Sequence, residues 1–309
     1  MKLIVVIVSW NTLELTRNCL NSLFPELRDI DGEVWIVDNH SSDGSVEMIK
    51  KEFPEVNLIE NAENVGFARA NNQILKIASG DLYLLLNTDT IIPQGSIRGL
   101  CAFMKNNPLA AAAGPKLKNA DEIVEMPLKP LPTLMGEFRY CLSYHFFPFE
   151  SLFRRILSYR QIDWRKITEP TEAEVLSAAC LIIRDEVIKT IGVLAEDYFL
   201  FSEENDYFYR MRRAGFKGYY IPEIEVIHLI GRSRKKRGRL DTEVNFFRSR
   251  SLFFKKFYGR KAYVFKIIYN FFFAWSCLME KLYILIKGRT NISGEVIYSE
   301  LLRTLRKNG

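Results

Sequence analysis

The sequence is poor in cysteine, and the cysteines it has are scattered. Its 309 residues contain five, Cys19, Cys101, Cys141, Cys180 and Cys277, with no CxxC spacing among them. Disulfide frameworks and zinc sites both need paired or closely spaced cysteines, so neither is indicated. We expect reduced, buried thiols.

The chain also lacks a long charge-free apolar run, internal repeats and low-complexity linkers. Its longest charge-free apolar stretch, 267–279, is shorter than the ~20 residues of a membrane-spanning helix. The apolar N-terminal run stops at Trp10 and Asn11 without a small-residue cleavage site, so we interpret it as a strand and not as a signal peptide. These absences lead us to expect a cytoplasmic protein.

The composition is that of an ordinary globular protein, with 48% hydrophobic and 26% charged residues. The net charge of +6 is concentrated late in the chain, where residues 232–239 read RSRKKRGR. Further basic residues follow this run: Arg248, Arg250, Lys255, Lys256, Arg260 and Lys261. The pattern indicates an anionic partner, such as phosphates or membrane headgroups. No nucleic-acid partner is expected, because no recognition fold surrounds the run.

Apolar, β-branched segments alternate with helical ones through the first part of the chain. Strands are predicted at 3–9, 33–38, 57–60, 82–86 and 110–114, and helices at 12–23, 46–53, 67–78 and 96–106. This alternation predicts an α/β domain with a mostly parallel sheet and right-handed crossovers. Later segments predict strands at 174–184, 218–221 and 225–228, and helices at 133–159, within 197–214 and at 262–286. We place the α/β domain at 1–233 and a basic, aromatic helical region at 234–309.

The stretch 82–90 is central to this prediction. An unbroken apolar run, LYLLL, ends abruptly at Asn87, Thr88 and Asp89. Such a run is typical of a central parallel strand that is covered on both faces. Asp89 would then lie just past the strand end, where open sheets bind ligands and where a carboxylate can hold a hard divalent cation. The alternative is a loop carboxylate that caps the next helix.

Three further polar clusters follow predicted strands or start helices. They are Ser9-Trp10-Asn11, Asp38-Asn39 and the segment 64–72. Any one of them could be ordinary turn chemistry. Because the carboxyl ends of parallel strands share one edge, we expect all four clusters to converge on one crevice.

These segments resemble the family 2 inverting glycosyltransferases with the GT-A fold, especially bacterial rhamnosyltransferase-like members. The matching motifs are IVVIVSWNT, IVDNHSSDGS, NAENVGFARANN, LLLNTDT, FLFSEENDYFYR and VIHLIGRS, in the family's order over residues 1–233. The resemblance implies a Rossmann-like GT-A domain and transfer of a sugar from a nucleoside diphosphate.

The resemblance also implies roles for individual residues. Asp38 matches the acid that reads the nucleotide base, and Ser9 and Asn11 line the same pocket. The loop and helix that close on base and ribose are matched by Asn64, Gly66 and Arg69. Asn87, Thr88 and Asp89 match the aspartate motif, whose last carboxylate binds Mg²⁺ or Mn²⁺. His228 matches a late metal- or phosphate-contacting histidine, and Arg232 and Ser233 could close over the diphosphate.

Residues 202–206, SEEND, match the family's catalytic acid motif. By that match the general base is Glu204, with Glu203 as the alternative because Glu replaces the more common Asp. The alternative is that these acids only stabilise a helix N-terminus by interacting with the helix dipole. Asp206 is expected to orient the segment through Arg210, four residues later.

The expected function is metal-dependent inverting transfer of a sugar, first of all rhamnose from dTDP-rhamnose or else a UDP-sugar, to a lipid-linked or cell-surface glycan. Nucleotidyl transfer is disfavoured because no Gly-rich phosphate loop follows the first strand. A catalytically inactive nucleotide-sugar-binding scaffold remains the alternative. The segment 262–286 either lies on the inner face of the cell membrane as a peripheral anchor or packs on protein.

Overall fold

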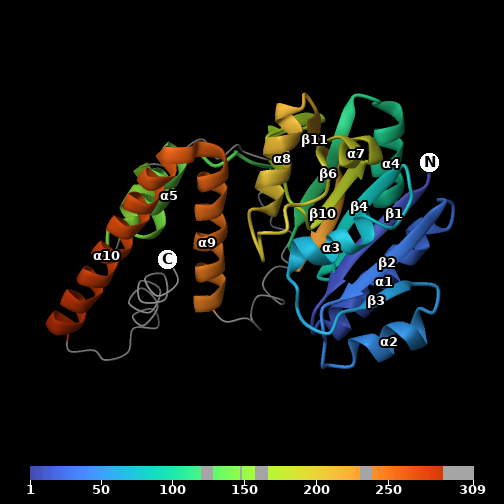
Figure 1. Ribbon diagram of the computed structural model, residues 1–309, viewed down its shortest axis with the longest axis horizontal. Helices are drawn as coiled ribbons and strands as arrows, with labels where there is room; N and C mark the ends of the chain where they lie inside the picture. The colour runs from blue at the N-terminus through green and yellow to red at the C-terminus, as the bar shows by residue number, and fades with distance from the viewer. Residues whose placement is uncertain (120–127, 147, 157–165, 230–238, 288–309) are drawn as a thin grey trace. The chain divides into compact units, whose positions relative to one another are not determined.

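The structure, a computed structural model, describes residues 1–119, 128–146, 148–156, 166–229 and 239–287 (Figure 1). The chain forms two compact units. Unit 1 comprises Met1–Leu131 and Trp164–Ser233, and unit 2 comprises Pro132–Asp163 and Arg234–Gly309. Unit 2 therefore combines the segment 132–163 with the C-terminal region.

The first part of unit 1 alternates strands and helices, as the sequence predicts. The elements are β1 (Leu3–Ser9), α1 (Leu13–Leu27), β2 (Gly32–Asp38), α2 (Ser45–Glu52), β3 (Asn57–Glu60), α3 (Phe67–Leu75), β4 (Leu82–Asn87), β5 (Thr90–Ile91), α4 (Ser96–Asn106) and β6 (Ala110–Lys118). Neighbours in the order β3-β2-β1-β4 pair in parallel. The parallel pairing follows from the helical crossovers between these strands.

The remainder of unit 1 makes the sheet mixed. Its elements are β7 (Leu128–Lys129), β8 (Thr171–Ala173), β9 (Val175–Leu176), β10 (Cys180–Arg184), α7 (Asp185–Ile191), α8 (Glu203–Arg213) and β11 (Lys217–His228). The main sheet has the order β3-β2-β1-β4-β10-β6-β11-β5, with β8 also paired to β11. Strand β10 is antiparallel to both of its neighbours.

Two sequence predictions in this part need correction. The single strand predicted at 174–184 is two strands in different sheets, because β9 pairs with β7 while β10 enters the main sheet. The two strands predicted at 218–221 and 225–228 are one continuous strand, β11. A register shift between Ile221 and Glu225 interrupts its pairing with β6, which is why the sequence pattern breaks there.

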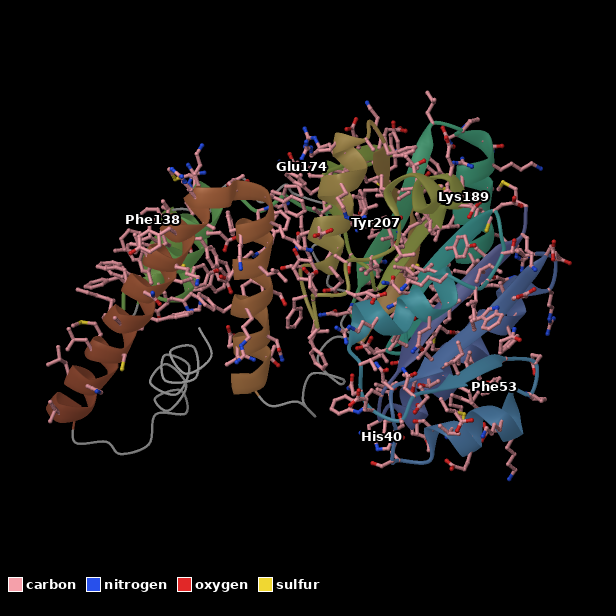
Figure 2. All side chains as sticks on the ribbon, viewed as in Figure 1. His40, Phe53, Phe138, Glu174, Lys189 and Tyr207 are labelled. Carbon is pink, nitrogen blue, oxygen red and sulfur yellow. The ribbon has the colours of Figure 1, made fainter. Side chains whose placement is uncertain are left out.

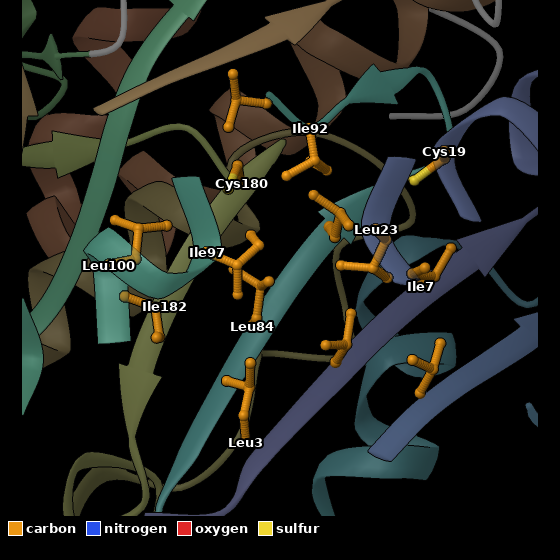
Figure 3. Packing of buried hydrophobic residues seen from close by; sticks show 14 of the residues in the cluster. Leu3, Ile7, Cys19, Leu23, Leu84, Ile92, Ile97, Leu100, Cys180 and Ile182 are labelled. Atoms are coloured by element: carbon orange, nitrogen blue, oxygen red, sulfur yellow. The ribbon is translucent and has the colours of Figure 1, made fainter. Parts of the chain in front are cut away.

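The sheet of unit 1 separates two hydrophobic cores. Successive residues of the same strand enter opposite cores, as Leu84 and Leu85 of β4 do. One core includes side chains of α1, α2 and α4, and Figure 3 shows its close packing around Leu84 and Leu23. The other includes side chains of α3, α7 and α8. Burial on both faces explains the continuous apolar run in β4.

Unit 2 is helical. It contains α5 (Leu134–Tyr144), α6 (Glu150–Ile156), α9 (Arg239–Tyr258), the 3-10 turn η3 (Gly259–Lys261) and α10 (Ala262–Lys287). The single helix predicted at 133–159 is thus interrupted between α5 and α6. The stretch Thr242–Met279 is long and apolar enough, by length and composition alone, to cross a membrane, and its most apolar 18-residue window has a mean hydropathy of 1.4. The turn η3 divides this stretch into two helices.

Candidate active site

The carboxyl ends of three parallel strands meet at one edge of the main sheet. The register places Ser9 opposite Asp38 on β1 and β2, and Val8 opposite Asn87 on β1 and β4. The polar residues that end these strands are therefore neighbours along the edge, as the sequence predicts. Open α/β sheets bind their ligands at this edge.

Asp89 and His228 contact each other there, although they lie far apart in the sequence. Antiparallel pairing of β5 with β11 sets Thr90 opposite His228. The Leu229 backbone N–H also donates to the Asp89 carbonyl oxygen at 2.7 Å. These bonds bring His228 Nε2 to 3.2 Å from Asp89 Oδ1, with both side chains largely buried.

This pair suits a cation that is shared with a ligand. Within the described ranges, no three His, Cys, Asp or Glu side chains gather to hold a metal ion. Mg²⁺ usually takes only one or two protein carboxylates and completes its shell with water and substrate phosphates. Mn²⁺ also favours oxygen ligands. The donors at Asp89 therefore fit a cation that is bound together with a diphosphate, and they do not fit a resident structural metal.

Asp38 carries a buried carboxylate that the protein satisfies only in part. The residue is 1% exposed. Its Oδ1 atom accepts a hydrogen bond from the Ser41 backbone N–H at 2.7 Å. Its Oδ2 atom is buried and accepts no hydrogen bond from the described residues. Because an unsatisfied buried acceptor is costly, this atom is a candidate for a further hydrogen-bond donor.

Asn11 braces the loop that follows Asp38. Its side-chain oxygen accepts from the Ser42 backbone N–H at 2.8 Å, and its backbone N–H donates to Ser41 Oγ at 2.8 Å. Asn11 has a positive φ of 53°, a conformation that Asn tolerates better than most residues. Ser9 is fully buried, and its hydroxyl lies 3.3 Å from the Thr12 hydroxyl. Both predicted residues thus hold the shape of the strand ends.

Gly66 lies in a turn that only glycine fits. Its φ is +87°, and a Cβ there would meet the Phe199 carbonyl oxygen at 2.6 Å. The Asn64 side chain accepts from the Gly66 N–H at 3.0 Å, which closes the turn. The next residue, Phe67, donates its N–H to the same Phe199 carbonyl at 3.0 Å. The loop 61–66 is therefore fixed directly against the segment around Phe199.

A second set of bonds ties α3 to the same segment, and sequence reasoning missed it. The Asn72 side chain donates to the Leu194 carbonyl at 2.8 Å and accepts from the Leu194 N–H at 3.0 Å. Asn72 also donates to Glu196 Oε1 at 3.0 Å, and Arg69 Nε donates to the Glu196 carbonyl at 3.2 Å. A signal was present, because Asn72 is a polar residue on the apolar face of the predicted helix.

The acid motif begins in a strained backbone. Phe201 and Ser202 both have positive φ values, 69° and 64°, which non-glycine residues adopt only when their surroundings impose it. Helix α8 starts directly after them. Farther along, Asp206 Oδ1 accepts from Arg210 Nε at 2.6 Å, and its Oδ2 accepts from the Tyr198 hydroxyl at 3.2 Å. The expected pairing of Asp206 with Arg210 is confirmed.

These bonds hold α8 at the end of the segment 194–202. Burial, with the Asp206 charge second, raises the pKa of Tyr198, so its hydroxyl stays protonated and donates. Arg210 also donates to the Ile191 and Val193 carbonyls, at 2.6 and 2.9 Å. The loop 61–66 and the acid motif are thus connected through one hydrogen-bonded segment.

Glu203 and Glu204 differ in their surroundings. Glu203 is 5% exposed. The Glu204 side chain is 12% exposed, and its Oε1 atom lies 3.3 Å from Lys129 Nζ of β7. A base must reach a proton on a bound acceptor, so the more accessible Glu204 is the better placed of the two. Lys129 was not a sequence candidate, because nothing in a two-residue strand indicates which residue it meets.

The remaining candidates have structural contacts or lie outside the described residues. The Asn87 N–H donates to the Ala179 carbonyl at 3.0 Å, and Thr88 is 6% exposed. Arg232 and Ser233 fall in the range 230–238, outside the described residues.

Comparison with known proteins agrees with this geometry. The sequence model described as Glycosyl transferase family 2 matches residues 4–190, which is more than half of the chain. The chain belongs to glycosyl transferase family 2. The matched range contains the strand ends with Asp38 and Asp89 and stops before α8, so the family assignment rests mainly on the half that would hold a nucleotide.

Three known proteins are similar to this chain. An N-acetylglucosaminyl-diphospho-decaprenol L-rhamnosyltransferase of Mycobacterium tuberculosis is 28% identical over 63% of this chain and 66% of its own length, just under two thirds. A dTDP-rhamnosyl transferase of Shigella flexneri, RfbF, is 23% identical over 73% of this chain and 68% of its own length. The structure of a Pyrobaculum calidifontis mannosyltransferase with GDP-Man and Mn²⁺ has a TM-score of 0.55 at 14% identity, covering 99% of this chain and 75% of that one. The last likeness shows the fold alone.

Proposed function

We propose that this glycosyl transferase family 2 member moves a sugar from a nucleoside-diphosphate donor to a hydroxyl of a lipid-linked or cell-surface glycan. The observation that carries the proposal is the strand-end edge of unit 1. There the partly satisfied carboxylate of Asp38 ends β2, and the contact between Asp89 and His228 forms just beyond β4. The Asp38 carboxylate suits a nucleotide base, and the contact between Asp89 and His228 suits a cation with a diphosphate.

The chemistry of Asp38 narrows the choice of nucleotide. Its unsatisfied oxygen is a position for a hydrogen-bond donor. Thymine and uracil present a ring N–H at N3, whereas cytosine presents a lone pair there. An acceptor that faces N3 would therefore favour dTDP- and UDP-sugars over CDP-sugars, whose exocyclic amino group is offset from that position. Because two relatives are named rhamnosyltransferases, dTDP-rhamnose is the first donor to test.

Asp89 and His228 would hold Mg²⁺ or Mn²⁺ together with the donor diphosphate. The cation would neutralise the charge that grows on the departing nucleoside diphosphate. Glu204 acts as general base and takes the acceptor hydroxyl proton while that oxygen attacks the anomeric carbon. The bond from that carbon to the diphosphate oxygen breaks in the same step, so a single displacement inverts the anomeric configuration. Lys129 keeps the Glu204 carboxylate oriented through its ion pair.

The bonds between α3, the segment 194–202 and α8 support a coupled site. A donor bound by the loop 61–66 would affect the position of the Phe199 carbonyl, which Gly66 and Phe67 contact. The same segment contains Tyr198, whose hydroxyl donates a hydrogen bond to Asp206 of α8. Orientation of both substrates by one connected framework would supply much of the rate enhancement.

Thermal stabilisation by nucleotides tests the proposal. The protein is melted with dTDP, UDP, GDP or CDP, each with Mn²⁺ or with EDTA. A ligand at 100 times its Kd stabilises the folded state by about 2.7 kcal/mol. We expect stabilisation by dTDP or UDP with Mn²⁺, loss of it in Asp89→Ala, and little effect of CDP. A folded protein that responds to no nucleotide would refute the proposal and leave a scaffold role.

A further inference from the structure

Unit 2 has a complete hydrophobic core of its own. Six of its aromatic side chains are at most 1% exposed, namely Phe253, Phe254, Phe265, Tyr269, Phe272 and Phe273. Their rings contact one another, as Phe254 and Phe265 do with centroids 4.7 Å apart. Helix α10 supplies four of these residues, so one face of α10 is already buried within the unit.

The opposite face of α10 is apolar too, and it is exposed. Its members recur every three, four or seven residues: Val264, Ile267, Phe271, Leu278, Leu282 and Leu285. At 100° per residue they fall within a sector of about 60°, roughly opposite the buried aromatics. Phe271 is 56% exposed and Leu285 is 79% exposed. We call this row the open face of α10, and at 1.5 Å per residue it is about 32 Å long.

Helix α5, which packs on α10, also exposes apolar side chains. The Phe138 ring lies against Phe272 of α10, with centroids 5.7 Å apart, and Figure 2 labels Phe138 beside these helices. Phe138 is 41% exposed, and Met135, one turn earlier, is 59% exposed. Unit 1, although it is larger, has only Met1, Ile77, Leu109 and Phe199 as exposed large apolar residues among those described, and they are scattered through its sequence. Contiguous apolar surface of this kind marks an interaction site.

The exposed charges of the same helical region are of one sign. Every exposed charged side chain described in α9, η3 and α10 is basic: Arg248, Lys255, Lys256, Arg260, Lys261, Lys266 and Lys281. Lys266, Asn270 and Lys281 follow one flank of the open face. Long lysine side chains there can extend to a polar boundary while their stems stay on apolar surface.

We propose that the open face of α10 docks unit 2 on the surface of a lipid bilayer with anionic headgroups. Helix α10 would lie in the membrane plane with its apolar row about 5–10 Å deep. The basic flank would bind headgroups. Because this surface belongs to unit 2, the inference does not depend on the transferase proposal.

Two other occupants fit less well. In a symmetric pair of copies the same patch meets itself, so the basic flanks of both copies would be brought together. For a spanning helix, lipid would have to surround α10, yet one face is packed on protein and Lys266 and Lys281 lie along its length.

Vesicle flotation of the full chain tests the docking surface. We expect the protein to float with vesicles of phosphatidylcholine and phosphatidylglycerol, weakly with phosphatidylcholine alone, and to be released by alkaline carbonate. The triple variant Ile267→Glu, Phe271→Glu, Leu278→Glu should lose at least tenfold in vesicle affinity. Lys266→Gln or Lys281→Gln should each lose about fivefold. The matched control, Ile77→Glu with Leu109→Glu in unit 1, should float like the original protein.

Folding of each variant is checked by its far-UV circular dichroism and cooperative melting, with Phe271→Ser as a milder substitute if the triple variant does not fold. No flotation of the folded original protein would overturn the proposal. So would resistance to carbonate, which would indicate a spanning helix. A dimer that is lost in the open-face variant, without flotation, would indicate a second copy instead. Failure of the transferase proposal would appear separately, in the nucleotide melting curves.

Discussion

Replacing Asp38 by Asn should lower nucleotide affinity without lowering the free energy of unfolding. The carboxylate is 1% exposed, and only its Oδ1 atom accepts a hydrogen bond, from the Ser41 N–H at 2.7 Å. Asn can keep that bond with its amide oxygen. The second position, where Oδ2 accepts nothing from the described residues, changes from an acceptor to an NH₂ donor.

The two effects have opposite signs. In the free protein the change removes a buried charge with an unsatisfied oxygen, whose cost is about 1–3 kcal/mol, so the free energy of unfolding should stay the same or rise by about 1 kcal/mol. In the complex the change removes a hydrogen bond to a charged group, worth about 1.5–3 kcal/mol. Nucleotide affinity should therefore fall by about 10- to 150-fold.

Urea unfolding and isothermal titration with dTDP or UDP and Mn²⁺ measure the two quantities on the same preparations. Glu47→Gln serves as the control, because it makes a carboxylate-to-amide change at an exposed position of α2. Two results would refute this account of the pocket. One is unchanged nucleotide affinity in Asp38→Asn, and the other is a loss of stability of 2 kcal/mol or more.

Five further substitutions have defined outcomes. Glu204→Gln should lower kcat by about 10²–10⁴ without changing nucleotide affinity, whereas Glu203→Gln should have a much smaller effect on kcat; equal losses would remove the distinction between them. Asp89→Asn should abolish the dependence of nucleotide melting on Mn²⁺, and a persistent dependence would place the cation elsewhere. Gly66→Ala should weaken donor binding because its Cβ would meet the Phe199 carbonyl at 2.6 Å at a positive φ, and unchanged donor Kd would contradict that contact. The Lys118 and Lys116 ammonium groups lower the pKa of Glu225. The stabilisation from these ion pairs is therefore present above pH 4.5 and is lost as the pH falls through the lowered pKa. Lys118→Met should cost about 0.5 kcal/mol of unfolding free energy at pH 7 and nothing at pH 2.

The ends of the parallel strands could be predicted from the sequence. Each ends in an abrupt change from apolar to polar residues, and strands joined by helices must run in parallel, so Asp38 and Asn87 had to share an edge with Ser9. The pairing of Asp206 with Arg210 followed from helical spacing alone. Both inferences depend on local periodicity, which the sequence displays directly.

Features set by tertiary contacts could not be predicted. The direction of β10 is invisible in its sequence, because a strand buried on both faces has the same apolar run whether it is parallel or antiparallel. Lys129 meets Glu204 from a two-residue strand, which is too short to show any period. The role of Asn72 depends on Leu194 and Glu196, which a single sequence does not link to it.

The most direct test of the central claim is nucleoside-diphosphate release from dTDP-rhamnose and UDP-sugars, with and without a lipid-linked diphosphate sugar acceptor, in the presence of Mn²⁺. The account predicts release that requires the acceptor, yields a product of inverted anomeric configuration and disappears in Glu204→Gln. A protein that binds these nucleotides yet releases none from any donor, with every acceptor tried, would contradict the transferase and establish a binding role instead.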